Sequence, residues 1–236
     1  MIPVQLPPEP NSFDASVRRE GLAHLQEQGQ DPDQYPPSRS LFAMRRIMAN
    51  GGERSCEYWQ LARDDLRKAY QGRCVYTCFF IESETLVGGK IVSGHAIDHF
   101  RPIHSSPARL AYEWSNLRWA WDFVDNYKGR QSIPQDHDPT RLKLDVLVLK
   151  ECLDGLLRVF PNPALPQEEQ ERLANTVSRL GLNQYTVAKA RTDCFEDFIV
   201  SAETYGQVFM MERQPFVYRY LLAYLKNKNA EMLGQP

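Results

Sequence analysis

The segment from Ala96 to Arg130 constrains the fold most, because it places an extended pattern and several polar groups inside a chain whose other segments are mostly helical. It opens with Ala-Ile-Asp-His-Phe-Arg-Pro and closes with Asp-Phe-Val-Asp-Asn-Tyr-Lys-Gly-Arg. An asparagine lies between these two ends at position 116. Carboxylates, an imidazole and a carboxamide in one short segment can together bind a divalent cation and move a proton. This segment is therefore the candidate site.

Apolar residues at helical spacing predict most of the remaining elements. A Pro-rich arm over residues 1–12 precedes helices expected over 13–28, 40–49 and 55–70. An apolar run rich in β-formers predicts a strand over 74–81, followed by a loop at Gly88-Gly89 and a short strand over 91–97. The pattern over 144–149 fits a strand, while 149–157 has helical spacing, and that alternative stays open. Further helices are expected over 167–180, 185–203 and 215–225.

Composition limits the class of protein and the way it could hold nucleic acid. The 28 Lys and Arg residues against 30 Asp and Glu residues give a net charge of -2. Tight binders of nucleic acid usually have a basic excess, so a nuclease of this charge would need a local patch or a partner. No apolar run of about 18 residues and no signal-peptide pattern occurs, so we expect no membrane span. An odd number of cysteines, five, favours reduced thiols in the cytoplasm.

Three short motifs in order resemble the HNH endonuclease family. They are Asp-His-Phe-Arg-Pro at 98–102, Glu-Trp-Ser-Asn-Leu at 113–117 and Asp-Asn-Tyr-Lys-Gly at 125–129, and the resemblance covers about 74–130. In that family two short strands and a helix hold one divalent metal ion, and a histidine activates the water that attacks phosphorus. The resemblance implies an α+β fold in which a small ββα-metal core is embedded in a mostly α-helical single globule. The regions would be 1–72, 73–131 and 132–236.

The resemblance also assigns roles to individual residues. It implies that His99 is the general base, that Asp98 is the first metal ligand, and that the amide of Asn116 holds the loop and orients the imidazole. A histidine, with an ordinary pKa of about 6.5, can take a proton from water at neutral pH. Because neighbouring side chains on a strand point to opposite faces, we expect a distortion at the strand end if both residues serve one site.

The last metal ligand departs from the usual family pattern. Family members place Asn or His three residues before the Lys and nine after the middle Asn, and both counts lead here to Asp125. Asn126 is its neighbour, and on a helix the two side chains diverge by about 100°, so only one can face the ion. A carboxylate suits one Mg²⁺ or Mn²⁺, which favours Asp125, with Asn126 as the alternative.

A structural Zn²⁺, common in the family, is not expected. Cys74 and Cys78 have the spacing Cys-x-x-x-Cys, and the positions of a second cysteine pair hold Trp121 and Val124. Two thiolates do not complete a tetrahedral zinc site. We therefore expect both thiols to pack in the core beside the tryptophans.

Basic residues gather around the motif. Arg101, Arg118, Lys128 and Arg130 are interpreted as contacts to DNA phosphates, with ordinary surface charge as the alternative reading. The basic residues of the expected helix over 55–70, including Arg63, are interpreted as a solvated face.

A second resemblance concerns the segment 173–191, which contains Ser-Arg-Leu-Gly-Leu-Asn. It is similar to the tail of HNH nucleases encoded with an ATPase partner in bacterial anti-phage systems of the Septu and retron types. Together the two resemblances predict a metal-dependent endonuclease that hydrolyses DNA phosphodiester bonds and works with an ATPase. The alternative is a catalytically inactive HNH-derived binding or regulatory module.

Overall fold

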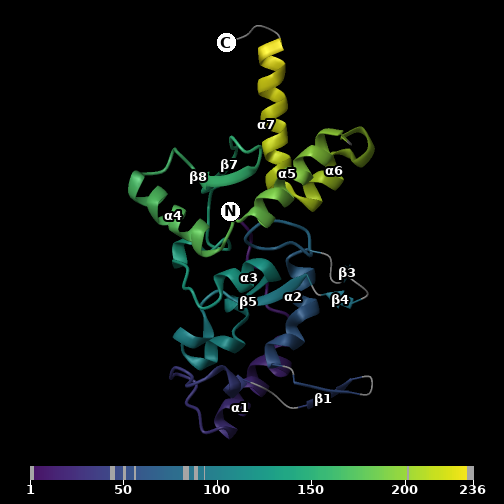
Figure 1. Cartoon of the computed structure of the whole chain (residues 1–236). Helices are drawn as coiled ribbons and strands as arrows, with labels where there is room; N and C mark the ends of the chain where they lie inside the picture. Colours follow the sequence, from purple (N-terminus) through teal and green to yellow (C-terminus); the bar gives the residue numbers. More distant parts are fainter. Residues whose placement is uncertain are drawn as a thin grey trace.

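The chain folds as a mostly helical α+β globule, as predicted (Figure 1). The computed structural model describes residues 3–42, 46–49, 52–55, 57–81, 85–87, 90–92, 94–200 and 202–232. The expected loop at Gly88-Gly89 lies outside the described residues, as does Cys56.

The first helices are confirmed at 13–28 and 55–70, and the one expected between them is wrong. A π-helical segment, Asp14–Arg18, runs into α1, Arg19–Glu27, while the 3₁₀ segment Tyr58–Ala62 runs into α2, Arg63–Ala69. Over 40–49 the structure has a 3₁₀ segment, Arg39–Phe42, and then β1, Arg46–Ala49, which pairs antiparallel with β2, Gly52–Ser55. The sequence Asn-Gly at 50–51 is a typical hairpin signal, and it outweighs the helical spacing before it.

The strand expected over 74–81 is also wrong. The chain turns there, because the Cys74 amide donates to the Phe79 carbonyl at 2.8 Å and the Cys78 amide donates to the Cys74 carbonyl at 2.8 Å. An isolated antiparallel bridge pairs Phe80, near the end of this stretch, with Arg73, just before it. Most of the apolar residues are buried, with Phe80 exposed, but an apolar run alone does not distinguish an extended segment from a compact one.

A ββα unit forms the centre of the molecule. β5, His95–His99, pairs antiparallel with β6, Leu117–Trp121, so that Asp98 lies opposite Arg118. α3, Asp122–Lys128, follows β6 directly and packs on both strands. The single strand expected over 91–97 is split, because β4, Lys90–Val92, pairs instead with β3, Thr85–Val87. Short 3₁₀ turns connect β5 to β6, at Ile103–Ser105, Ala108–Tyr112 and Trp114–Asn116.

The C-terminal region begins with a hairpin and continues as helices. β7, Leu147–Glu151, pairs with β8, Leu157–Pro161, so the helix that was the alternative for 149–157 is wrong. The strand expected over 144–149 overlaps the first residues of β7. The three later helices that were expected are confirmed as α4, Gln167–Arg179, α5, Tyr185–Val200, and α7, Pro215–Met232. A further helix that was not expected, α6, Ala202–Arg213, lies between α5 and α7. In Figure 1, α7 extends away from the body. None of the described helices is long and apolar enough to span a membrane.

One cluster of buried apolar side chains draws on all three expected regions. It contains Phe13 and Trp59 from the first region, Trp119 from the second, and Leu173 and Val217 from the third. The helical regions and the ββα unit therefore share a core, in agreement with a single globule.

Gly181, just after the end of α4, packs closely against α3. Its φ of +60° is a conformation that side chains rarely adopt, and a Cβ added there would lie 2.6 Å from the ring of Tyr127 on α3. Gly155, in the β7–β8 turn, has a φ of +73° but no atom within 4 Å of such a Cβ.

Comparing Gly181→Ala with Gly155→Ala separates backbone strain from the clash with Tyr127. Both variants carry the backbone cost, but overpacking should destabilise Gly181→Ala by about 1–3 kcal/mol more. For a chain of this size each kcal/mol lowers Tm by about 2–4 °C in thermal unfolding. Equal Tm values for the two variants would contradict the close packing of α3 against the end of α4.

Candidate metal centre and active site

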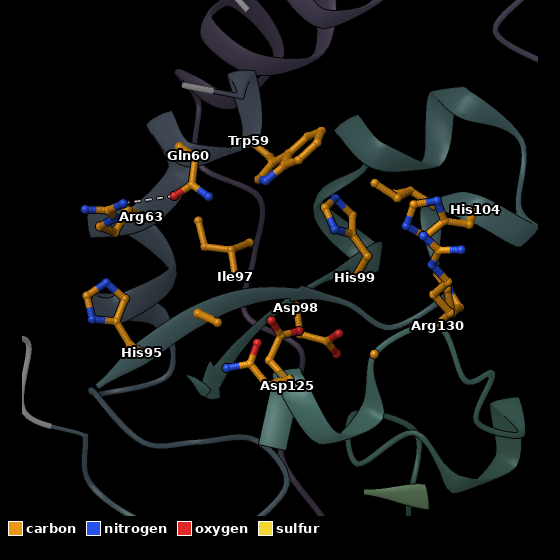
Figure 2. Close-up of a pocket in the computed structure, with 15 residues that line it drawn as sticks. Trp59, Gln60, Arg63, His95, Ile97, Asp98, His99, His104, Asp125 and Arg130 are labelled. Atoms are coloured by element: carbon orange, nitrogen blue, oxygen red, sulfur yellow. Dashed lines mark hydrogen bonds between the residues drawn. The ribbon is translucent and has the colours of Figure 1, made fainter. Parts of the chain in front are cut away.

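The expected base, the expected metal ligands and Arg130 line one pocket of about 480 Å³ at β5 (Figure 2), whereas Asn116, Arg101, Arg118 and Lys128 do not line it. β5 contributes Asp98 and His99, and α3 contributes Asp125 and Asn126. The loop after β5 and the segment around Trp59 complete the walls. The ββα unit therefore brings together the two ends of the motif that are about 30 positions apart in the sequence.

Asp98 is held ionised by buried donors. Its carboxylate is 3% exposed, and Lys128 Nζ donates to Oδ1 at 2.6 Å while the Tyr76 hydroxyl donates to Oδ2 at 2.5 Å. Burial raises the pKa of Asp98, but the charge of Lys128 and hydrogen bonds from Lys128, Tyr76 and Asp125 outweigh it, so the pKa lies below its usual value. Lys128 Nζ also donates to the His99 carbonyl at 2.6 Å.

The Asp98 and Asp125 carboxyl groups lie close together between β5 and α3 (Figure 2). Two carboxyl groups this close either share a proton or hold a cation between them, because two bare carboxylates repel. Lys128 and Tyr76 each bind one oxygen of Asp98, and Asp125 lies within hydrogen-bonding reach of the same carboxylate, which offers about four lone-pair positions in all. An all-oxygen donor set suits Mg²⁺ or Mn²⁺, so Asp98 and Asp125 fit such an ion. Asn126 lines the same pocket but is exposed.

The imidazole of His99 is oriented by a backbone carbonyl. His99 is the last residue of β5 and is 9% exposed, and its Nε2 lies 3.1 Å from the Ala111 carbonyl oxygen. A carbonyl only accepts hydrogen bonds, so we assign the proton of the neutral ring to Nε2, which makes Nδ1 the basic nitrogen. The indole of Trp59 meets the ring edge-on, with centroids 4.7 Å apart.

Alternation along β5 sends His99 and Asp98 to opposite sides of the strand (Figure 2). Both nevertheless line the same pocket, because the strand ends at His99 and the chain bends at Phe100. At the end of β5, side chains from both faces of the strand can therefore line one pocket.

Asn116 holds the loop that carries the partner of His99. Its Oδ1 accepts from the Arg101 amide at 2.8 Å, and its Nδ2 donates to the carbonyls of Arg101 at 3.1 Å and Leu110 at 2.9 Å. Ala111, which fixes the imidazole, follows Leu110 directly. Asn116 is therefore a positioning residue that acts on His99 through this loop.

Two of the four basic residues expected to contact DNA are in the interior. Arg118 is 1% exposed, pairs with Asp138 at 2.5 Å, and lies over the ring of Phe100 at 5.3 Å. Lys128 is equally buried on Asp98. The phosphate-contact prediction is wrong for both, because buried carboxylates bind these cations. Arg101 and Arg130 are exposed, and Arg130 lines the pocket.

Several residues of the site carry no sequence signal that identifies them. Tyr76 donates to Asp98 from a stretch that looked like an ordinary apolar run, and His95 and His104 line the pocket beside the expected residues. Trp59, Gln60 and Arg63 come from the N-terminal helical region. Contacts across such separations arise only when the chain is folded.

The cysteine pair lies in the core. Cys74 and Cys78 are buried, and burial raises the pKa of the Cys74 thiol. At the positions of a second pair, Val124 is fully buried and Trp121 packs against the core.

A second group of potential metal ligands is an ion-pair network. Among the described residues, Asp136, His137 and Glu169 are the three His, Cys, Asp or Glu side chains whose ligand atoms lie within 4.8 Å of one another. Arg172 donates to Asp136 at 2.5 Å and to Glu169 at 2.6 Å. Its guanidinium bridges the two carboxylates, so a protein cation already holds them together.

Comparisons with protein-family models, with curated proteins and with solved structures find no match to this chain.

Replacing Arg118 tests its structural role. Arg118→Gln leaves the Asp138 carboxylate buried without its cation, so we expect the free energy of unfolding to fall by about 3–5 kcal/mol in urea denaturation. Arg130→Gln removes the same charge from an exposed position and should change stability by less than about 0.5 kcal/mol. Equal stability of the two variants would show that the buried pair contributes little.

Replacing Lys128 tests what keeps Asp98 ionised. In the wild type the lowered pKa of Asp98 contributes stability above the unfolded value of about 3.9, which is lost as the pH falls through the folded pKa. In Lys128→Met the cation is absent, so burial dominates and raises the pKa of Asp98. Ionisation of Asp98 as the pH rises therefore destabilises this variant. The difference in unfolding free energy between wild type and variant should grow from about pH 4 to pH 7. A difference independent of pH would contradict this assignment.

Proposed function

We propose that this protein is a metal-dependent endonuclease of the HNH type that hydrolyses DNA phosphodiester bonds. The observation that carries the proposal is the ββα unit, in which Asp98, His99 and Asp125 surround one pocket. Their order in the chain is the one that the resemblance to HNH endonucleases implies. The oriented imidazole beside paired carboxylates supplies the groups that hydrolysis of a phosphodiester needs.

Each residue has a task in this mechanism. His99 Nδ1 accepts the proton of the attacking water, while the Ala111 carbonyl keeps the ring in the required tautomer and orientation. Asp98 and Asp125 would hold the ion, and Lys128 keeps Asp98 ionised. A bound Mg²⁺ or Mn²⁺ supplies stabilisation of negative charge on the phosphate and the leaving oxygen. Arg130, exposed at the pocket, contacts a substrate phosphate.

The same proposal includes a partner. With a net charge of -2, and with Arg118 and Lys128 turned inward, few cations around the site remain for DNA. Because phosphate neutralisation supplies most of the non-specific affinity for DNA, a partner would provide the rest. The resemblance of 173–191 to nucleases of Septu and retron systems supports an ATPase as that partner, in cytoplasmic defence against phage.

One observation favours the alternative, an inactive HNH-derived binding or regulatory module. Lys128 and Tyr76 each donate one hydrogen bond to an oxygen of Asp98, so the buried carboxylate has partners even without a divalent ion. In such a module the buried ion pair would be purely structural.

Plasmid cleavage in Mg²⁺ or Mn²⁺ distinguishes the two functions. We expect nicked or linear product that EDTA abolishes, and a rate about 10²–10⁴-fold lower for His99→Ala, because general-base catalysis is lost. His24→Ala, on α1 and outside the pocket, is the matched control and should cut normally. If Asp125 is the metal ligand, the metal concentration that gives half-maximal cleavage should be higher for Asp125→Ala than for Asn126→Ala.

Absence of cutting, both by the chain alone and with the product of a neighbouring ATPase gene, would exclude the endonuclease and favour the module. Full activity of His99→Ala would exclude His99 as the base.

A further inference from the structure

The N-terminal helical region forms one wall of the candidate active site. Trp59 is buried and packs edge-on against the His99 ring, which fixes the 3₁₀ segment Tyr58–Ala62 beside the end of β5. Gln60 belongs to this segment and Arg63 is the first residue of α2. Both side chains line the pocket. None of these three residues belongs to the ββα unit.

Arg63 differs from the buried cations of the site in how its charge is used. It is exposed, and among the described residues it has no ion pair with a carboxylate, although Asp64 and Asp65 follow it in the chain. Its Nη2 donates to the Gln60 carboxamide oxygen at 2.9 Å. A neutral amide orients the guanidinium without neutralising it, whereas Asp138 neutralises Arg118.

The cations of the pocket lie at its two ends. In Figure 2, Arg63 lies near His95 at one end of β5, and Arg130 lies near His104 at the other end. Asp98 and Asp125 lie between these ends. Because the two arginines lie at opposite ends of β5, a polynucleotide lying along the pocket would offer each of them a phosphate of its own.

We propose that Arg63, oriented by Gln60, binds a phosphate of the substrate strand on the side of the candidate metal centre opposite Arg130. This inference rests on the proposed function and extends it, because the N-terminal helical region becomes part of the nucleic-acid site. The planar guanidinium binds a phosphate through two parallel hydrogen bonds, which an ammonium does not reproduce. The substrate is therefore a strand with phosphates on both sides of the scissile bond, and the solvated-face interpretation of Arg63 is replaced.

Equilibrium binding tests the role of Arg63 without any cleavage. Fluorescence anisotropy with a labelled DNA duplex and the matching single strand, in Mg²⁺ and in a His99→Ala background, should show Kd raised about tenfold by Arg63→Gln. The slope of log K against log salt should become less steep by about 0.7–0.9. Arg63→Lys should retain the slope of log K against log salt, because the positive charge stays. It should lose part of the affinity, because an ammonium cannot form the two parallel hydrogen bonds of a guanidinium.

Arg67→Gln is the matched control. Arg67 lies one turn later on α2, is exposed, and does not line the pocket, so its replacement removes the same charge from the same helix. We expect it to change Kd by less than about twofold, as for a charge in solvent. Thermal unfolding should give equal Tm values for the Arg63 and Arg67 variants, since both side chains are exposed.

The outcomes separate this inference from the proposed function. If the protein binds DNA with the expected dependence on Arg63 but never cuts, the endonuclease proposal fails and the Arg63 contact stands. If the protein cuts DNA, and the Arg63→Gln and Arg67→Gln variants have the same KM and kcat, the proposed contact between Arg63 and a phosphate is refuted. The endonuclease proposal then stands. Equal Kd values for the two variants, or no binding to either DNA, also refute the contact.

Discussion

The buried ion pair between Lys128 and Asp98 is the interaction on which the rest of the site depends. It joins the last turn of α3 to β5, and the same ammonium group also binds the His99 carbonyl. Neither charge could stay buried without the other, so the pair forms only when the strand and the helix are in place. Asp125 lies one turn before Lys128 on α3, and this docking of the helix therefore brings its carboxyl group to Asp98.

Four contacts from the surrounding elements hold this arrangement. Asn116 ties the loop that orients the imidazole, and the Arg118–Asp138 pair fixes β6 against the segment that follows α3. Close packing of Gly181 on Tyr127 joins α4 to the outer face of α3. Trp59 packs against the His99 ring from the N-terminal side. The flanking helical regions thus determine the shape of the pocket as well as the stability of the core, which is why the site cannot be understood from the ββα unit alone.

Charge distribution connects this architecture to the proposed activity. Burial of Arg118 and Lys128 removes two cations from the surface that a nucleic acid would meet, and Arg63 and Arg130 remain exposed at the pocket. Two exposed arginines at the pocket would provide little affinity for DNA, which is why the proposed endonuclease includes a partner that holds the substrate. A fold does not specify a function, so the chemistry of the site carries the proposal.

The sequence by itself determined the local patterns: the helices expected over 167–180 and 185–203, which the structure places at 167–179 and 185–200, the order of the polar groups from Asp98 to Asp125, and the mostly helical class. These follow from periodicity and spacing within a few turns of chain, which sequence records directly. Only the tertiary structure decided which cations are buried, that 74–81 turns instead of extending, and that Arg63 borders the pocket. Each of these depends on partners distant in sequence, such as Asp138 for Arg118 or His99 for Trp59, and burial next to such partners outweighs local preference.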